Sequence, residues 1–161
     1  IKNDQEAQIM IYTIQDVKVA CNAALRNAFA NDAIKIYGND TLDGYTRPSF
    51  FTEVLSHGRQ KGSPYLTQIG FTFRITYFEE THDEARCLEV YEKICKAFEP
   101  TIKVKGRVRL IVNSIDYSWI DENADKLQVV ISFLDLIELG GYTEKEEQMQ
   151  ELNVNYEREA N

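Results

Sequence analysis

The first patterned segment of the chain, residues 13–29, carries apolar side chains at helical spacing. Polar residues between them, such as Lys18 and Arg26, fall on the opposite side. Thr13 followed three residues later by Asp16 is typical of a helix N-terminus. The pattern predicts an amphipathic helix with an apolar stripe of Ile14, Val17, Cys21, Ala24, Leu25 and Ala28.

A second helical pattern covers residues 81–98. Thr81 and Glu84 have the spacing of a capping box, and Pro100 follows the end of the pattern, where it stops a helix. Because the apolar face is wide, we expect this helix to pack flat on a sheet. The apolar positions are Cys87, Leu88, Val90, Tyr91, Ile94, Cys95, Ala97 and Phe98.

Alternating apolar and polar residues predict strands in most of the remaining chain. In the clearest example, Phe71, Phe73 and Ile75 share one face while Thr72 and Arg74 lie on the other. The sequence predicts strands at 34–37, 49–56, 69–77, 107–119 and 126–138.

Residues 57–64 separate two of these strands and contain two glycines and a proline, which predict a flexible hairpin loop. The segment also carries Arg59 and Lys61 in an otherwise acidic protein. Two interpretations stay open: a solvated hairpin tip, or a loop whose positive charges contact a partner.

This order of elements predicts the α+β class: a largely antiparallel or mixed sheet of four to five strands with two helices packed on it. We expect an N-terminal leader at 1–12, one domain at 13–142 and an acidic tail at 143–161. The tail has six glutamates against Lys145 and Arg158 and no core stripe. We therefore expect it to contact a neighbouring subunit or a partner protein.

The last two predicted strands, 107–119 and 126–138, carry apolar residues on both faces. A sheet covered by helices on one side needs fewer. Either both faces are covered within the monomer, or one face meets another subunit. Ile111 and Val130 are our candidates for subunit contacts on these strands.

Composition narrows the classes of function. The 161 residues include 18 Lys and Arg against 26 Asp and Glu, a formal net charge of −8 and a pI near 4.8. This balance disfavours sequence-specific nucleic-acid binding and docking on anionic membranes. No apolar run reaches the roughly 18 residues of a membrane helix. Three cysteines in helical segments are typical of core thiols in a reducing cytoplasm.

No group of residues has the spacing that catalysis or metal binding requires. His57 and His82 are not spaced with other metal ligands, and the cysteines fall on apolar helical faces, where thiols are inert. An acidic cluster near 116–125 lacks the regular ligand spacing of a calcium loop. We therefore expect no catalytic residues, no cofactor, no metal site and no enzymatic activity.

The arrangement from the first helix to the aromatic strand ending near residue 78 resembles a known family. Its strongest pieces are Tyr37-Gly38 followed by Arg47-Pro48-Ser49-Phe50-Phe51. The chain, over roughly 10–141, is similar to the tail terminator (tail completion) proteins of tailed bacteriophages and related phage-tail-like particles.

The resemblance implies an α/β structural protein of the virion, assembled in the host cytoplasm. It implies a homo-oligomeric ring, usually of six copies, that sits on the last ring of the tail tube and stops tube polymerisation. The implied partners are the tail tube protein, the head–tail connector protein at the head–tail joint and, in a contractile tail, the sheath protein. No role for the acidic tail follows from the resemblance.

Two other classes of function stay open. One is another head–tail joining protein, such as a connector or adaptor. The other is a small-molecule-binding or enzymatic α+β domain with Tyr117, Trp119 and the acidic cluster near 116–125 close to a pocket.

Overall fold

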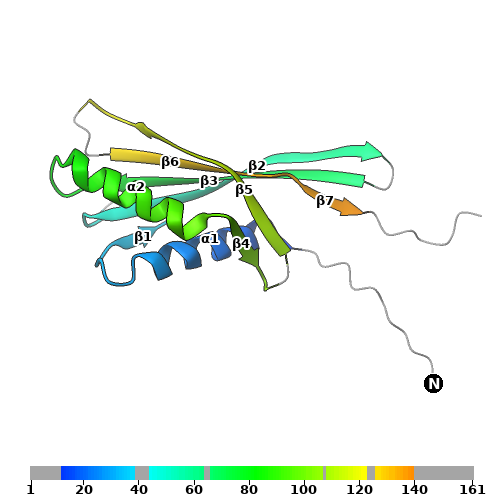
Figure 1. The fold of residues 1–161 in the computed structure, drawn as a ribbon, viewed down its shortest axis with the longest axis horizontal. Helices are drawn as coiled ribbons and strands as arrows, with labels where there is room; N and C mark the ends of the chain where they lie inside the picture. Colours follow the sequence, from blue (N-terminus) through cyan, green and yellow to red (C-terminus); the bar gives the residue numbers. More distant parts are fainter. Residues whose placement is uncertain (1–11, 39–43, 64–65, 107, 123–125, 140–161) are drawn as a thin grey trace, which may run out of the picture.

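The computed structural model describes residues 12–38, 44–63, 66–106, 108–122 and 126–139 (Figure 1). The predicted leader lies almost wholly outside these ranges, and the acidic tail lies entirely outside them. The described elements are α1 (Ile14–Ala28), β1 (Lys35–Tyr37), β2 (Ser49–Ser63), β3 (Leu66–Phe78), α2 (Glu84–Phe98), β4 (Thr101–Val104), β5 (Val108–Trp119), β6 (Lys126–Phe133) and β7 (Leu136–Leu139).

These strands form one mixed sheet. Its order is β1-β2-β3-β6-β5-β4, and β7 pairs with the part of β3 that β6 does not reach. β1 runs parallel to β2, and every other pair is antiparallel. Both helices lie on the same side of the sheet, which we call the helix face (Figure 1). The opposite side is the outer face. The predicted α+β class is therefore correct.

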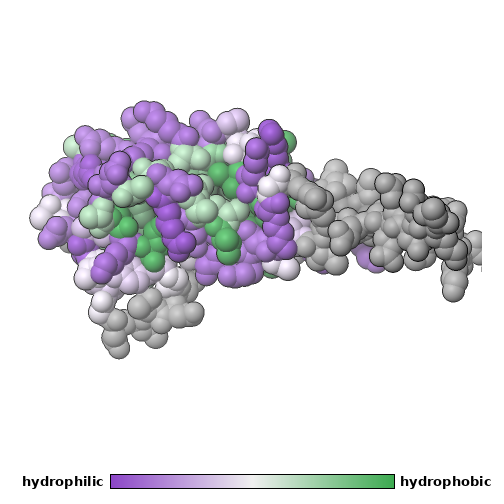
Figure 2. All heavy atoms as spheres, turned by 90° about the horizontal axis from the view of Figure 1, so that it is seen from below, coloured by the Kyte–Doolittle hydropathy of each residue, from purple (hydrophilic) through white to green (hydrophobic). Residues whose placement is uncertain are grey.

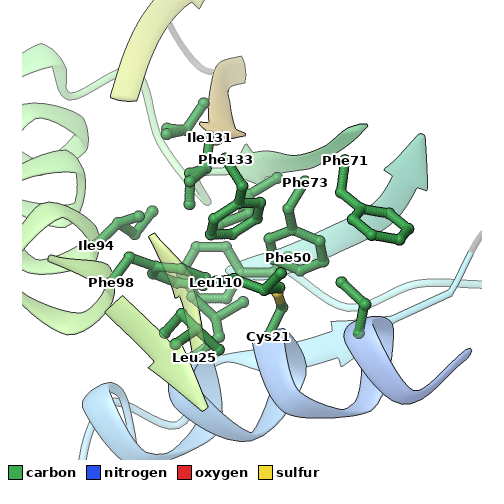
Figure 3. Close-up of a cluster of buried hydrophobic side chains, with 14 of the residues drawn as sticks. Cys21, Leu25, Phe50, Phe71, Phe73, Ile94, Phe98, Leu110, Ile131 and Phe133 are labelled. Carbon is green, nitrogen blue, oxygen red and sulfur yellow. The ribbon is translucent and has the colours of Figure 1, made fainter. Parts of the chain in front are cut away.

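The core lies between the helices and the helix face. Cys21 and Leu25 from α1 and Ile94 and Phe98 from α2 meet side chains of the central strands (Figure 3). Along β6 the residues alternate between buried and half-buried, which is the period-2 pattern of a sheet with one covered face. The buried strand residues in Figure 3 are Phe50, Phe71, Phe73, Leu110, Ile131 and Phe133.

The helix starts are set by side-chain caps. The Thr13 hydroxyl accepts from the Asp16 amide at 3.2 Å, while the Asp16 carboxylate accepts from the Thr13 amide at 2.7 Å, the reciprocal pair of a capping box. At α2 the predicted cap is wrong. Asp83, not Thr81, is the N-cap, and its carboxylate accepts from the Arg86 amide at 3.1 Å.

The predicted loop at 57–64 is also wrong. Residues up to Ser63 continue β2, and β2 and β3 form a long hairpin whose far end extends beyond the helices (Figure 1). We call the part formed by 56–63, 66–71 and β7 the arm. Gly58 has a φ of +86° at an irregularity in the pairing, so glycine here serves a bulge within a strand.

The number of strands exceeds the expectation of four to five. Four residues after Pro100 form β4, which is too short to show an alternating pattern in the sequence. The last predicted strand is divided into β6, which ends at Phe133, and β7, which begins at Leu136. Between them the Leu134 amide donates a hydrogen bond to the Ile111 carbonyl at 2.8 Å. Seven strands therefore occupy the described residues.

The two-faced pattern predicted for 107–119 comes from a second bulge. Val112 pairs with Phe133, but Ser114 pairs with Ser132, so one extra residue enters β5 at Asn113. An extra residue reverses the alternation, and Ile115 and Trp119 therefore pack against the core beneath the helices. The expected apolar excess on the other face is mostly absent from β5.

Candidate assembly interface

One edge of the sheet is open along β5. β6 pairs with one side of β5, while on the other side β4 covers only Val108–Ile111. Beyond this point no strand of the described ranges pairs with that side, although α2 covers part of it. Tyr91 donates a hydrogen bond from its hydroxyl to the Ile115 carbonyl at 3.0 Å. Backbone groups at an open edge can pair with another chain.

Aromatic side chains line this edge. The rings of Tyr91 and Tyr117 are 4.7 Å apart, and the rings of Tyr117 and Trp119 are 6.4 Å apart in an edge-to-face arrangement. Tyr117 is 45% exposed and Ile120 is 50% exposed. Half-exposed tyrosine and tryptophan beside unpaired backbone are typical of protein interfaces.

A second edge is open along β2, on the far side of the sheet. β1 covers only Ser49–Phe51, and the rest of β2 as far as Ser63 has no second partner strand among the described residues. Arg59 and Lys61 lie on this strand. Charged side chains on an edge strand oppose aggregation through that edge, so this edge favours a partner of complementary charge.

The outer face between these edges is largely polar. Across four strands, Glu53, Arg74, Val130 and Asp116 occupy one row. Arg74 forms an ion pair with Glu53 at 3.1 Å. Val130, a predicted contact residue, is half-buried between the positions of Arg74 and Asp116. The apolar residues predicted on both faces of the last two strands therefore do not form a broad apolar outer face.

Ile111, the other predicted apolar contact, is 49% exposed, and its backbone partner Leu134 is 46% exposed. Ile111 is the last residue of β5 that β4 covers, so it lies where the open edge begins. Sequence reasoning missed Leu134, because it was assigned to the interior of one continuous strand. The four predicted contact residues thus fall into two groups. Arg59 and Lys61 lie on β2, and Ile111 and Val130 lie on β5 and β6, with β3 between the groups.

A cavity of about 200 Å³ lies where the arm meets the start of α1. Arg59 is part of its wall, which the prediction of a loop at 57–64 could not reveal. The lining residues are Tyr12, Thr13, Ile14, Ser56, Arg59, Ile69 and Phe71.

The titratable groups of the core show no arrangement for nucleophilic chemistry. Burial raises the pKa of the Cys21 thiol to about 12, and burial also raises that of Cys95. No cluster of three or more metal-ligating side chains occurs within the described ranges. In the same part of the chain no helix has the length and apolar character needed to cross a membrane.

Three of the residues that carry the family resemblance, Tyr37, Arg47 and Phe51, contact one another or Phe78 on the outer face, while Phe50 lies in the core. The Tyr37 and Phe51 rings stack at 5.4 Å, and Phe51 contacts Phe78 at 5.0 Å. The Arg47 guanidinium lies 5.5 Å from the Phe78 ring centroid and donates to the Glu79 carbonyl at 3.2 Å. The motif thus attaches the segment before β2 to the sheet.

Comparison with known families decides the class of protein. A family model described as phage tail terminator protein matches residues 16–150, which include most of α1 and every strand of the sheet. The chain belongs to the phage tail terminator family. No curated protein matches the chain. Membership confirms the resemblance seen in the sequence and makes the chain a structural component of a phage tail.

Proposed function

We propose that the chain forms a ring that caps the tail tube, stops its polymerisation and joins it to the head connector. Family membership supports the tail role. The observation that carries the ring is the pair of open edges, on β2 and on β5, at opposite sides of one sheet.

A closed ring needs a heterologous contact, in which two different patches of each subunit meet. The two open edges differ in chemistry. The β5 edge offers Tyr117, Ile120 and the nearby Ile111, all close to half exposed. The β2 edge offers an extended strand with Arg59 and Lys61. Adding the strand of one copy to the edge of the next satisfies backbone groups on both.

Within this proposal six copies form the ring at the head–tail joint, as the family resemblance implies. The tail tube protein and the connector protein bind its two ends, and a sheath protein binds its rim in a contractile tail. Another role in head–tail joining is the second candidate function. A protein with that role binds the connector without arresting tube growth.

The test adds full-length protein to polymerising tail tube protein and measures tube lengths by electron microscopy, with native mass spectrometry to count subunits. Wild-type protein should shorten the tubes. Ile111→Asp should abolish ring formation and capping while changing unfolding free energy by no more than about 0.5 kcal/mol, because Ile111 is half exposed.

Val19→Asp is the matched control, since Val19 is 57% exposed on α1 and lies on neither open edge. Figure 2, which views the molecule from below Figure 1, shows a patch of hydrophobic residues among hydrophilic ones. The control should still cap tubes. Equal capping by both variants, or wild-type protein that never associates with tube ends, contradicts the proposal.

A further inference from the structure

The bulge at Gly58 decides which arm residues face the cavity. Ser56 pairs with Phe71 and Arg59 pairs with Ile69, so β2 advances three residues while β3 advances two. Paired residues share a face, and the extra residue therefore brings Arg59 to the helix face. Lys61, which pairs with Thr67, follows on the same face. Two positive charges thus lie in a row along the inner side of the arm.

The cavity beside these charges has an apolar base. Phe71 is 2% exposed and Ile69 is 5% exposed, and the Tyr12 ring packs edge-to-face on Phe71 at 6.3 Å. Ile14, at 48% exposure, forms the rim. An occupant that matches this surface combines an apolar side chain or two with several carboxylates.

The C-terminal segment of the chain has this composition. Residues 143–161 contain six glutamates against Lys145 and Arg158. Three apolar residues, Leu152, Val154 and Tyr156, occur at alternate positions in the same segment. The N-terminal residues 1–11, which also lie outside the described structure, have only two acidic residues against one lysine. They therefore match the positive charges of Arg59 and Lys61 less well.

The point where the described chain ends favours the same occupant. β7 ends at Leu139, which pairs with Leu66 on β3. Ile69 lies three residues further along β3, a distance of about 10 Å at roughly 3.3 Å per residue. β7 runs from Leu136, beside Ile69, towards the tip of the arm, so the chain must reverse direction after Leu139 to reach the cavity. The 22 residues that follow Leu139 are long enough for this reversal and the return. Because residues 143–161 are joined to β7 by only a few residues, their effective concentration at the cavity is high.

We propose that residues 143–161 dock in cis on the inner side of the arm, with glutamates facing Arg59 and Lys61 and an apolar side chain in the cavity. This proposal concerns the single subunit and does not depend on ring formation. It replaces the expectation that the acidic segment contacts a neighbouring copy or a separate partner.

The first experiment places a photo-crosslinking amino acid at Ile14 of the full chain. Mass spectrometry then identifies the attached peptide in a mixture of ¹⁴N- and ¹⁵N-labelled protein. We expect attachment to peptides from 143–161 with both ends carrying the same isotope. Attachment to residues 1–11, attachment between unlike isotopes, or no attachment to the C-terminal segment overturns the proposal.

The second experiment tests the charges in the same crosslinking chain. Arg59→Glu with Lys61→Glu should lower the crosslink yield roughly 2- to 30-fold, the range for two exposed ion pairs. Adding Glu147→Lys and Glu151→Lys should restore it. The control, Arg26→Glu with Lys35→Glu, makes the same change of net charge at exposed positions in the last turn of α1 and on β1.

An unchanged yield in the arm variant, or an equal loss in the control, overturns the role of Arg59 and Lys61. Crosslinking is measured on isolated subunits at low protein concentration. Failure of tube capping leaves this result unaffected, so the two proposals fail separately.

Discussion

The Tyr91 hydroxyl in α2 donates a 3.0 Å hydrogen bond to the main-chain carbonyl of Ile115 in β5. In an antiparallel pair, alternate residues direct their backbone groups away from the partner strand. Tyr117 and Trp119 therefore direct theirs to the same open side as Ile115. The helix satisfies one outward carbonyl of this edge and leaves the aromatic end of the strand for another contact.

Tyr91→Phe should lower the unfolding free energy by about 1 kcal/mol, because the Ile115 carbonyl loses a partly buried donor. Chemical denaturation measures the change. Tyr117→Phe is the control, since the Tyr117 hydroxyl makes no hydrogen bond to the described residues, and it should change stability by less than half as much. Equal losses would show that the bond contributes nothing specific.

The same phenol predicts a pH dependence. Burial is the main cause that raises the Tyr91 pKa from 10.0 to about 12. The folded state therefore holds this proton more tightly than the unfolded chain does, and the resulting stability is present below pH 10 and lost as pH rises to about 12. Wild-type protein should lose more unfolding free energy between pH 10 and pH 12 than Tyr91→Phe. Parallel pH profiles would contradict this assignment.

Gly70 lies under two side chains of the outer face. A Cβ at this position would be 2.7 Å from the Asp135 carboxylate and 3.3 Å from the His57 ring. Gly70→Ala should cost about 1 kcal/mol, although alanine in an unobstructed strand is normally the more stable residue. In an Asp135→Ala background the substitution should become neutral or stabilising. A double-mutant cycle by thermal unfolding measures this coupling, and additive effects would refute it.

The two glycines of the arm should respond in opposite directions. Gly58 has a φ of +86°, which an L side chain adopts only with strain, whereas Gly62 has ordinary backbone geometry and open space around its Cβ position. Gly58→Ala should destabilise the protein by about 1 kcal/mol. Gly62→Ala should stabilise it slightly. Urea denaturation compares the two variants, and equal effects would argue against the bulge geometry.

The helices could be predicted from sequence because their periodicity persists over four turns and their ends have local causes. Both predicted helices end within one residue of the observed limits, at Ala28 and Phe98. The cap of α2 was misplaced because Thr81 and Asp83 are both good capping residues. Which of them caps depends on the direction of the chain after β3.

The sheet was harder to predict because its bulges at Gly58 and Asn113 leave no distinct sequence signal. Gly58 reads as a loop residue, yet it lies within β2. Asn113 interrupts the alternation of β5, and a one-residue shift moved Ile115 from the outer face to the core. The candidate interface was predicted in part. Ile111 is exposed as expected, but the open edges follow from strand order, which periodicity cannot supply.

The arm bulge also limits how arms can be exchanged between terminator proteins. A graft that joins β2 of one protein to the arm of another carries its side chains on the intended faces only if the bulge at 57–58 forms in it. If the same residues paired one to one with β3, Gln60 would take the helix side and the two cations the other. The face that each grafted side chain takes therefore depends on how many residues each strand has at this boundary, even when the sequence of the arm is unchanged.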